Sequence, residues 1–315
     1  MPLYKYVTPE RTDILKNGLI RFTQPVAFND PFETLPCFLG GLPDDIVKGL
    51  LEDNLADPNL YKGTLLSIFK TEMNKRHPET IVPAEAWDVI NNLIPAKDAA
   101  KIMQPIASIV SNQFAQFMGE GDLFKKYTLK SVLKSINKDY GLLCLAENPN
   151  NLLMWAHYAA SHTGFAIEFN EKHPFFDKRE KQEELGRCLT KVTYTKVRPK
   201  TFLLDPKIEE EQFRKRWAHD IFFTKSEHWE YEEEWRMLEF LKNCSHIERN
   251  EPYDICLFPI PFDCITGVIF GCRALDNLKS DIGHLKQTNS SYSHIQLFEA
   301  YIDEKEYMLN FRAII

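Results

Sequence analysis

The sequence lacks the features of exported, membrane-spanning and disulfide-bonded proteins. Its first residues, Met-Pro-Leu-Tyr-Lys-Tyr, contain no apolar segment of the kind found in a signal peptide. No run approaches the roughly 18 apolar residues that a helix needs to cross a bilayer. The seven cysteines form no C-x-x-C pair, and their odd number and scatter argue against a disulfide framework and a structural zinc site. These absences predict a cytoplasmic protein with no membrane partner.

Several familiar catalytic motifs are also missing. The chain contains no P-loop, no G-x-S-x-G and no G-x-G-x-x-G sequence. No two histidines are four residues apart, so the sequence predicts no metal site. The net charge of −7 gives no overall field that would attract nucleic acid or an anionic membrane, and we expect no strong nucleic-acid binding.

What the sequence does contain is the composition of an ordinary globular protein, with 44% apolar and 26% charged residues. Apolar residues at three- and four-residue spacing predict several helices between residues 43 and 138. Strand patterns dominate on either side of that stretch. We therefore predict an α+β fold, with a mostly antiparallel sheet core formed by residues 1–42 and 139–315 and a helical insertion at 43–138. The predicted strands include Leu3–Val7, Gly141–Leu145, Gly164–Phe169, Thr190–Tyr194, Asp254–Phe258, Ile265–Phe270, Ile295–Ala300 and Tyr307–Ala313.

An acidic run at residues 229–236 is the most unusual stretch of the chain. Aromatic residues and carboxylates alternate there, which predicts a strand with Glu230, Glu232 and Glu234 on one face. Such a row of charges can simply face solvent. It can also line a cleft, where a carboxylate meets a ribose hydroxyl, a developing cation or a metal. Arg236 shares the face and could either balance these charges or grip a phosphate.

Three further sets of residues are candidates for a binding site. Trp155, His157 and Tyr158 lie on a short predicted helix, where they could stack on a base and shuttle a proton or belong to the core. Asp30 lies in the turn Phe-Asn-Asp-Pro-Phe-Glu, which could shape a cleft or anchor the turn to the core. Lys5 is flanked by tyrosines on the first predicted strand and could bind a diphosphate or be a surface lysine.

Five separated blocks resemble the bacterial DUF2971 family, a family of unknown function. The blocks are Leu3–Tyr6, Phe28–Glu33, Asn151–Tyr158 with Gly164–Phe169, Lys225-Ser226 leading to Trp229–Arg236, and Gly267–Gly271. Their order is similar to that of an ADP-ribosyltransferase core, which carries one residue on a first strand, an aromatic or hydroxyl residue next, and a late glutamate. Lys5 or Tyr6, Tyr158, and Glu232 or Glu234 match these positions in turn. Lys5 replaces the Arg or His usual in that superfamily.

The resemblance implies a protein that binds NAD and either transfers ADP-ribose to an acceptor macromolecule or hydrolyses the bond to nicotinamide. Glu234 would stabilise the oxocarbenium-like charge, assisted by Glu232 and Tyr158. The resemblance further implies that the cofactor is bound by Lys5, Tyr6, Asp30, Trp155, His157 and Arg236. By analogy, many such proteins are bacterial toxins or phage-defence effectors.

Two other functions are compatible with the same residues. One is a non-catalytic sensor or interaction protein that keeps the fold without the chemistry, which the lysine at position 5 favours. The other is a nucleotide hydrolase that uses the same carboxylates with a divalent ion. The helices at 43–138 could provide a docking surface for a partner in any of these cases.

Overall fold

A computed structural model of the chain describes residues 1–40, 58–76, 83–93, 95–101, 122–180 and 186–314. The chain divides into two units. The first comprises residues 1–37, 131–200 and 211–315, and the second comprises residues 38–130 and 201–210. All the residues predicted from the sequence to form the site belong to the first unit.

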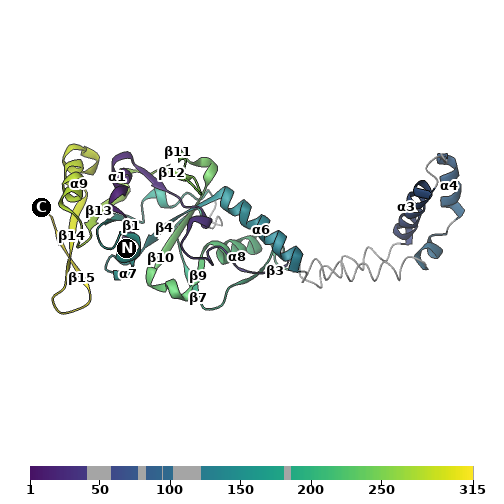
Figure 1. Cartoon of the computed structure of the whole chain (residues 1–315), viewed down its shortest axis with the longest axis horizontal. Coiled ribbons are helices and arrows are strands. Elements are labelled where there is room, and N and C mark those ends of the chain that lie inside the picture. The colour runs from purple at the N-terminus through teal and green to yellow at the C-terminus, as the bar shows by residue number, and fades with distance from the viewer. Residues whose placement is uncertain (41–57, 77–82, 94, 102–121, 181–185, 315) are drawn as a thin grey trace. The chain divides into compact units, whose positions relative to one another are not determined.

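The first unit is organised around an eight-stranded sheet (Figure 1). Its strand order is β15-β14-β13-β5-β1-β4-β10-β6. The β13–β14 pair is parallel and the other six pairs are antiparallel. The prediction of a mostly antiparallel α+β fold is therefore confirmed. The strands are β1 (Leu3–Val7), β4 (Tyr140–Ala146), β5 (Phe165–Phe169), β6 (Thr190–Lys191), β10 (Glu234–Phe240), β13 (Ile265–Phe270), β14 (Gln296–Ile302) and β15 (Leu309–Ala313).

Smaller sheets and helices complete the described chain. A three-stranded sheet has the order β11-β12-β2, β7 pairs with β9, and β3 pairs with β8. These strands are β2 (Leu19–Arg21), β3 (Cys37–Gly40), β7 (Thr193–Thr195), β8 (Lys200–Phe202), β9 (Thr224–Ser226), β11 (His246–Glu248) and β12 (Ile255–Pro259). The helices are α1 (Asp13–Asn17), α3 (Pro58–Arg76), α4 (Ala84–Leu93), α6 (Asp122–Asp139), α7 (Leu152–Tyr158), α8 (Glu210–Phe222) and α9 (Asp276–Thr288). Within the part described, no helix combines the length and apolarity that a membrane span requires.

The central strand β1 is buried on both faces because its side chains alternate between two apolar clusters. Leu3 and Val7 belong to the main core, whereas Tyr4 and Tyr6 pack against Trp155 and its neighbours. Burial on both faces explains why the strand carries almost no polar residue. The exception is Lys5, whose position is described with the site below.

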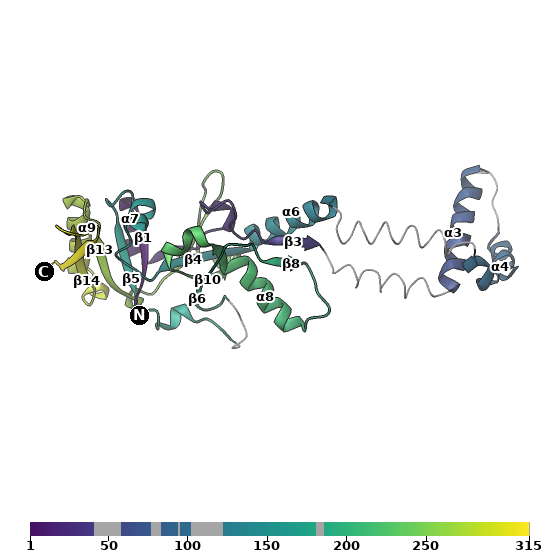
Figure 2. The same cartoon turned by 90° about the horizontal axis from the view of Figure 1, so that it is seen from below.

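Helix α7 lies beside β1 (Figure 1 and Figure 2). Asn151 caps its first turn, since its side chain accepts hydrogen bonds from the backbone N–H groups of Leu153 and Met154. After the helix, the backbone returns to β5 through three successive residues with positive φ, at 160–162. Gly164 then passes so close to β1 that a Cβ there would overlap the carbonyl oxygen of Val7. The helix is thus capped at its start, and the segment that follows it is held closely against β1.

β1 and β4 share only one registered residue pair, Tyr4 opposite Ala146. By contrast, β1 pairs with β5 along its whole length, from Leu3 to Val7. β1 and β4 are therefore paired at a single position. Lys5 follows that pair, and its Nζ donates to the carbonyl oxygen of Cys144 on β4 at 3.2 Å.

We expect Gly164→Ala to destabilise the fold because the added methyl group overlaps backbone that cannot move away. The expected loss in the free energy of unfolding is about 1–3 kcal/mol or more, measured by chemical denaturation. Gly283→Ala is the matched control, since a Cβ there meets nothing within 4 Å inside α9. That control should keep or gain stability, by roughly 0.5–1 kcal/mol. Equal stability of the two variants would contradict the close approach.

Candidate functional site

The acidic run does not form the continuous strand that its alternation predicts. Residues Glu227–Glu232 form a 3-10 helix, Glu233 adopts a left-handed conformation with φ of 45°, and β10 begins only at Glu234. Local chemistry explains the difference. Ser226 caps the helix by accepting from the N–H of His228, and acidic residues in the first turn favour a helix start. Glutamate also has a low preference for strands.

Glu232 and Glu234 nevertheless meet, because the turn at Glu233 brings both side chains to one lysine. Lys225, on β9, donates to Glu232 Oε2 at 2.6 Å and to Glu234 Oε2 at 3.2 Å. Side chains of all three residues are at least 94% buried. A buried charge is costly unless it is paired, so each of these groups depends on the others.

Arg236 connects this lysine-centred group to the Asn-Asp-Pro turn. Its guanidinium donates from Nε and one terminal nitrogen to Glu234, at 2.9 and 3.0 Å. The two terminal nitrogens also contact the Glu33 carboxylate, at 2.6 and 3.1 Å, and one of them donates to the Phe222 carbonyl oxygen at 2.8 Å. These contacts use all five N–H donors of the guanidinium. Arg236 is fully buried and does not line the pocket described below, so it holds carboxylates in place instead of contacting a phosphate.

The two glutamates differ in their surroundings and in their acidity. Burial alone would raise the pKa of Glu234, but the charges of Arg236 and Lys225 outweigh it and hold the pKa at about 2. For Glu232 burial dominates and raises the pKa, and the charge of Glu234 adds to the rise while Lys225 opposes it. Glu234 is therefore a fixed anion, and Glu232 is the carboxyl group whose protonation can respond to a ligand.

Tyr158 completes the surroundings of Glu232. Its hydroxyl donates to Glu232 Oε1 at 2.6 Å and accepts from the Asn29 side-chain amide at 3.1 Å. Burial and the neighbouring Glu232 charge raise the pKa of Tyr158, so the phenol stays protonated as a donor. Asn29, Glu33 and the buried Asp30 all come from the same turn. Asp30 shapes that turn by accepting from the N–H of Phe32 at 2.9 Å.

A pocket of about 370 Å³ within the first unit is lined by Asn29, Tyr158 and Glu232, whereas Asp30 and Glu33 are not among its lining residues. Its walls come from β1, β2, β4, α7, the Asn29 turn and the Glu232–Glu234 segment. That volume lies near the lower end of the roughly 300–1,000 Å³ that is usual for small-molecule sites. The charged and hydroxyl-bearing side chains on its walls include Lys5, Arg21, Tyr158, Lys225, Glu232 and Glu234.

The remaining predicted residues divide between the pocket and the core. Tyr6 and His157 line the pocket, and His157 Nδ1 lies 3.2 Å from the Tyr231 hydroxyl. Trp155 is fully buried and donates from Nε1 to the Pro149 carbonyl oxygen at 2.8 Å, so it is a core residue. Tyr6 packs edge-on against Trp155, with ring centroids 5.0 Å apart.

The comparison with protein families gives one match. Residues 154–237 match the model of DUF2971, a family described as proteins of unknown function. This segment belongs to DUF2971. No curated protein and no solved structure matches the chain. The DUF2971 segment includes Tyr158, Lys225, Glu232, Glu234 and Arg236, so it carries most of the buried ionic group.

Some functional side chains come from outside the DUF2971 segment, and sequence reasoning missed three of the site residues. Glu33 and Arg21 lie more than a hundred residues before the segment; Glu33 ends the Phe28–Glu33 block, and Arg21 belongs to no recognisable motif. Lys225 was visible only as part of a family block. Its pairing with Glu232 depends on a turn that the alternating pattern did not predict.

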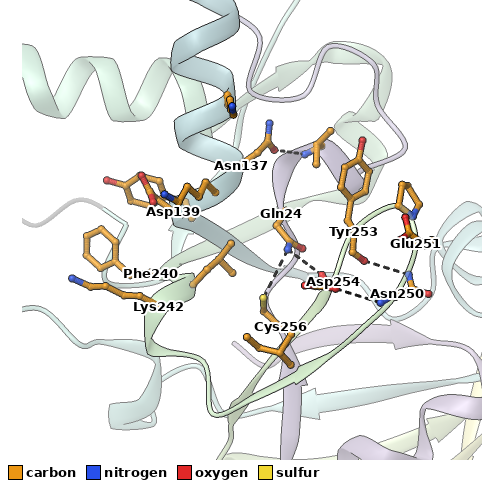
Figure 3. A pocket seen from close by; sticks show the side chains of 17 residues that line it. Gln24, Asn137, Asp139, Phe240, Lys242, Asn250, Glu251, Tyr253, Asp254 and Cys256 are labelled. Carbon is orange, nitrogen blue, oxygen red and sulfur yellow. Dashed lines mark hydrogen bonds between the residues drawn. The ribbon is translucent and has the colours of Figure 1, made fainter.

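A second pocket, of about 940 Å³, lies apart from the DUF2971 glutamates (Figure 3). Gln24 lies between Phe240 and Lys242 on one side and Tyr253 and Glu251 on the other. The Gln24 amide donates to the Asp254 carbonyl oxygen at 3.0 Å. None of the residues predicted to form the site lines this larger pocket, and its lysines are exposed. The smaller pocket, with its buried charges, is therefore the candidate site.

Metal binding gains no support from the side chains. In the part of the chain that the structure describes, no group of three or more His, Cys, Asp or Glu residues is arranged to hold an ion. The metal-assisted hydrolase therefore remains without a donor set there.

Arg236→Met should strongly destabilise the protein, because it leaves Glu33 and Glu234 buried without their shared cation. The expected loss in the free energy of unfolding is roughly 3–5 kcal/mol, measured by denaturant titration. Arg312→Met is the control. Arg312 also pairs with a glutamate, Glu299, but its side chain is 67% exposed, and its loss should cost less than about 1 kcal/mol. Similar losses in the two variants would show that the buried group does not behave as one unit.

The depressed pKa of Glu234 predicts a specific pH dependence. Ionised Glu234 contributes stability above its usual pKa of 4.5, and this contribution is lost as the pH falls towards about 2. The stability difference between the wild type and Glu234→Gln should therefore be largest near neutral pH, on the order of 3 kcal/mol, and shrink between about pH 4.5 and 2. Unfolding titrations at several pH values measure it. A difference that stays constant over this range contradicts the assignment.

Proposed function

We propose that the pocket binds a nucleotide of the NAD type and that Glu232 promotes cleavage of the bond between its ribose and its base. The position of Glu232 carries this proposal. It lines the pocket, it is 97% buried, and each of its carboxylate oxygens has a single partner, Tyr158 or Lys225. Both oxygens therefore keep capacity to accept a further hydrogen bond.

The chemistry follows from charge. When the glycosidic bond breaks, the electron pair leaves with the base and positive charge develops on the ribose carbon and ring oxygen. A fixed carboxylate beside that carbon stabilises the charge, and it does so best where water is excluded. The contact with Lys225 favours the ionised form of Glu232, and Tyr158 fixes its orientation. Water or an acceptor group then adds to the same carbon and releases its proton.

This assignment exchanges the roles that the sequence suggests for the two glutamates. Glu234 accepts two hydrogen bonds from Arg236 and one from Lys225, so its oxygens are largely committed to the chain. We therefore propose that Glu234 positions Lys225 and that Glu232 acts on the ligand. An ADP-ribosyltransferase-like core, with Lys5, Tyr158 and Glu232 around the nucleotide, is the fold-level form of the same proposal.

Glu232→Gln should lower the release of nicotinamide from NAD by about 100-fold or more, the loss usual for one electrostatic contact to a transition state. Release is measured with purified protein, with and without cell lysate as a source of acceptor. Glu230→Gln is the matched control, because Glu230 lies in the same 3-10 helix but is exposed. It should keep full activity.

Other outcomes decide between the alternatives. If NAD raises the melting temperature but no nicotinamide is released, the non-catalytic binding protein is favoured. If NAD neither raises the melting temperature nor is cleaved, the proposal is wrong. Activity that appears only with Mg²⁺ or Mn²⁺ would favour the metal-assisted hydrolase.

A further inference from the structure

The pocket also contains two cations, Lys5 and Arg21, that form no direct ion pair within the described part of the chain. Lys5 and Arg21 line it, and neither has a carboxylate oxygen within 4.0 Å among the residues that the structure describes. Within the described part of the chain, the hydrogen-bond partner of Lys5 is the neutral carbonyl oxygen of Cys144. The Nε atom of Arg21 is buried and has no hydrogen-bond partner within the same part of the chain.

By contrast, the fully buried charges of the site make direct ion pairs. Glu33, Glu232 and Glu234 each contact Lys225 or Arg236, at distances of 2.6–3.2 Å, whereas Lys5 and Arg21 are half-buried. Burial of a cation without a counterion is unfavourable, and proteins rarely retain it without a reason. Here burial lowers the pKa of Lys5, and burial together with the charge of Arg11 lowers the pKa of Arg21. The nearby Asp13 carboxylate is already paired with Arg11, at 2.9 Å.

We propose that Lys5 and Arg21 form a phosphate subsite and that the ligand of the pocket is a nucleoside carrying a 5′-phosphate. Two cations match the charge of a phosphate monoester, which is close to −2 at neutral pH. The guanidinium fork suits two phosphate oxygens and the ammonium acts as a point charge. Thr23 lies two residues after Arg21 and lines the same pocket, so its hydroxyl adds a third donor.

The size of the pocket narrows the substrate class further. About 370 Å³ suits a single nucleotide better than a dinucleotide. The smallest complete ligand is therefore a mononucleotide, and the second half of NAD would extend outside. That the ligand contains a nucleoside rests on the proposed function. The phosphate subsite itself rests only on the two cations without an ion pair.

The test compares ribose 5-phosphate with ribose, because neither probe has a base to lose and binding is separate from bond cleavage. Calorimetry should show that the wild-type protein binds ribose 5-phosphate about 10- to 100-fold more tightly, the factor given by one or two charge-assisted hydrogen bonds. Arg21→Gln should abolish this preference. Lys16→Gln, which removes an exposed lysine outside the pocket, should leave it unchanged.

Stability without ligand separates a binding role from a structural one. Because no carboxylate pairs with Arg21 in the part of the chain that the structure describes, Arg21→Gln should melt at the same temperature as the wild type or higher, whereas loss of a structural arginine would lower it. Equal binding of the two probes by the wild type, or an unchanged preference in Arg21→Gln, would overturn the subsite. A phosphate preference in a protein that releases no base would retain the subsite and reject the glycosidic chemistry. Base release without a phosphate preference would retain the glycosidic chemistry and reject the phosphate subsite.

Discussion

The candidate site depends on a single fully buried guanidinium. Arg236 holds Glu33 and Glu234 with four of its five donors, and Lys225 in turn donates to Glu234. Without this cation three carboxylates would repel one another in a region closed to water. The contacts also join segments that are far apart in the sequence, since Glu33 and Arg236 are 203 residues apart. The ionic group therefore sets the geometry of the pocket as well as its charge.

As a consequence of this arrangement, Glu232 and Glu234 have different surroundings although both are buried glutamates. Glu232 and Glu234 share Lys225, but only Glu234 also contacts the guanidinium. Glu234 is thus held as an anion, whereas burial raises the pKa of Glu232. Pairs of titratable groups whose surroundings separate their pKa values are a general sign of acid–base or electrostatic roles.

The strands were easier to predict from the sequence than the site. Segments such as Ile265–Phe270 are mostly apolar and bounded by turns, and the structure places β13 on the same residues. The acidic run failed because period-two alternation ignores the helix cap at Ser226 and the reversal at Glu233. The convergence on Lys225 follows from that reversal, so no pattern along the chain could have predicted it. Arg21 could be recognised only once its missing counterion was visible in three dimensions. The helices predicted at 43–138 lie partly outside the described residues, although α3, α4 and most of α6 fall within that range.

Because β1 and β4 share a single residue pair, the large sheet consists of two sets of strands that are paired to each other at one position. One set comprises β15, β14, β13, β5 and β1, and the other comprises β4, β10 and β6. Lys5 belongs to the first set, and the ionic group around Arg236 is built on the second. A ligand that contacts both Lys5 and Glu232 would connect the two sets of strands at the place where β1 and β4 share one residue pair. Binding of such a ligand would then add contacts between the two parts of the sheet.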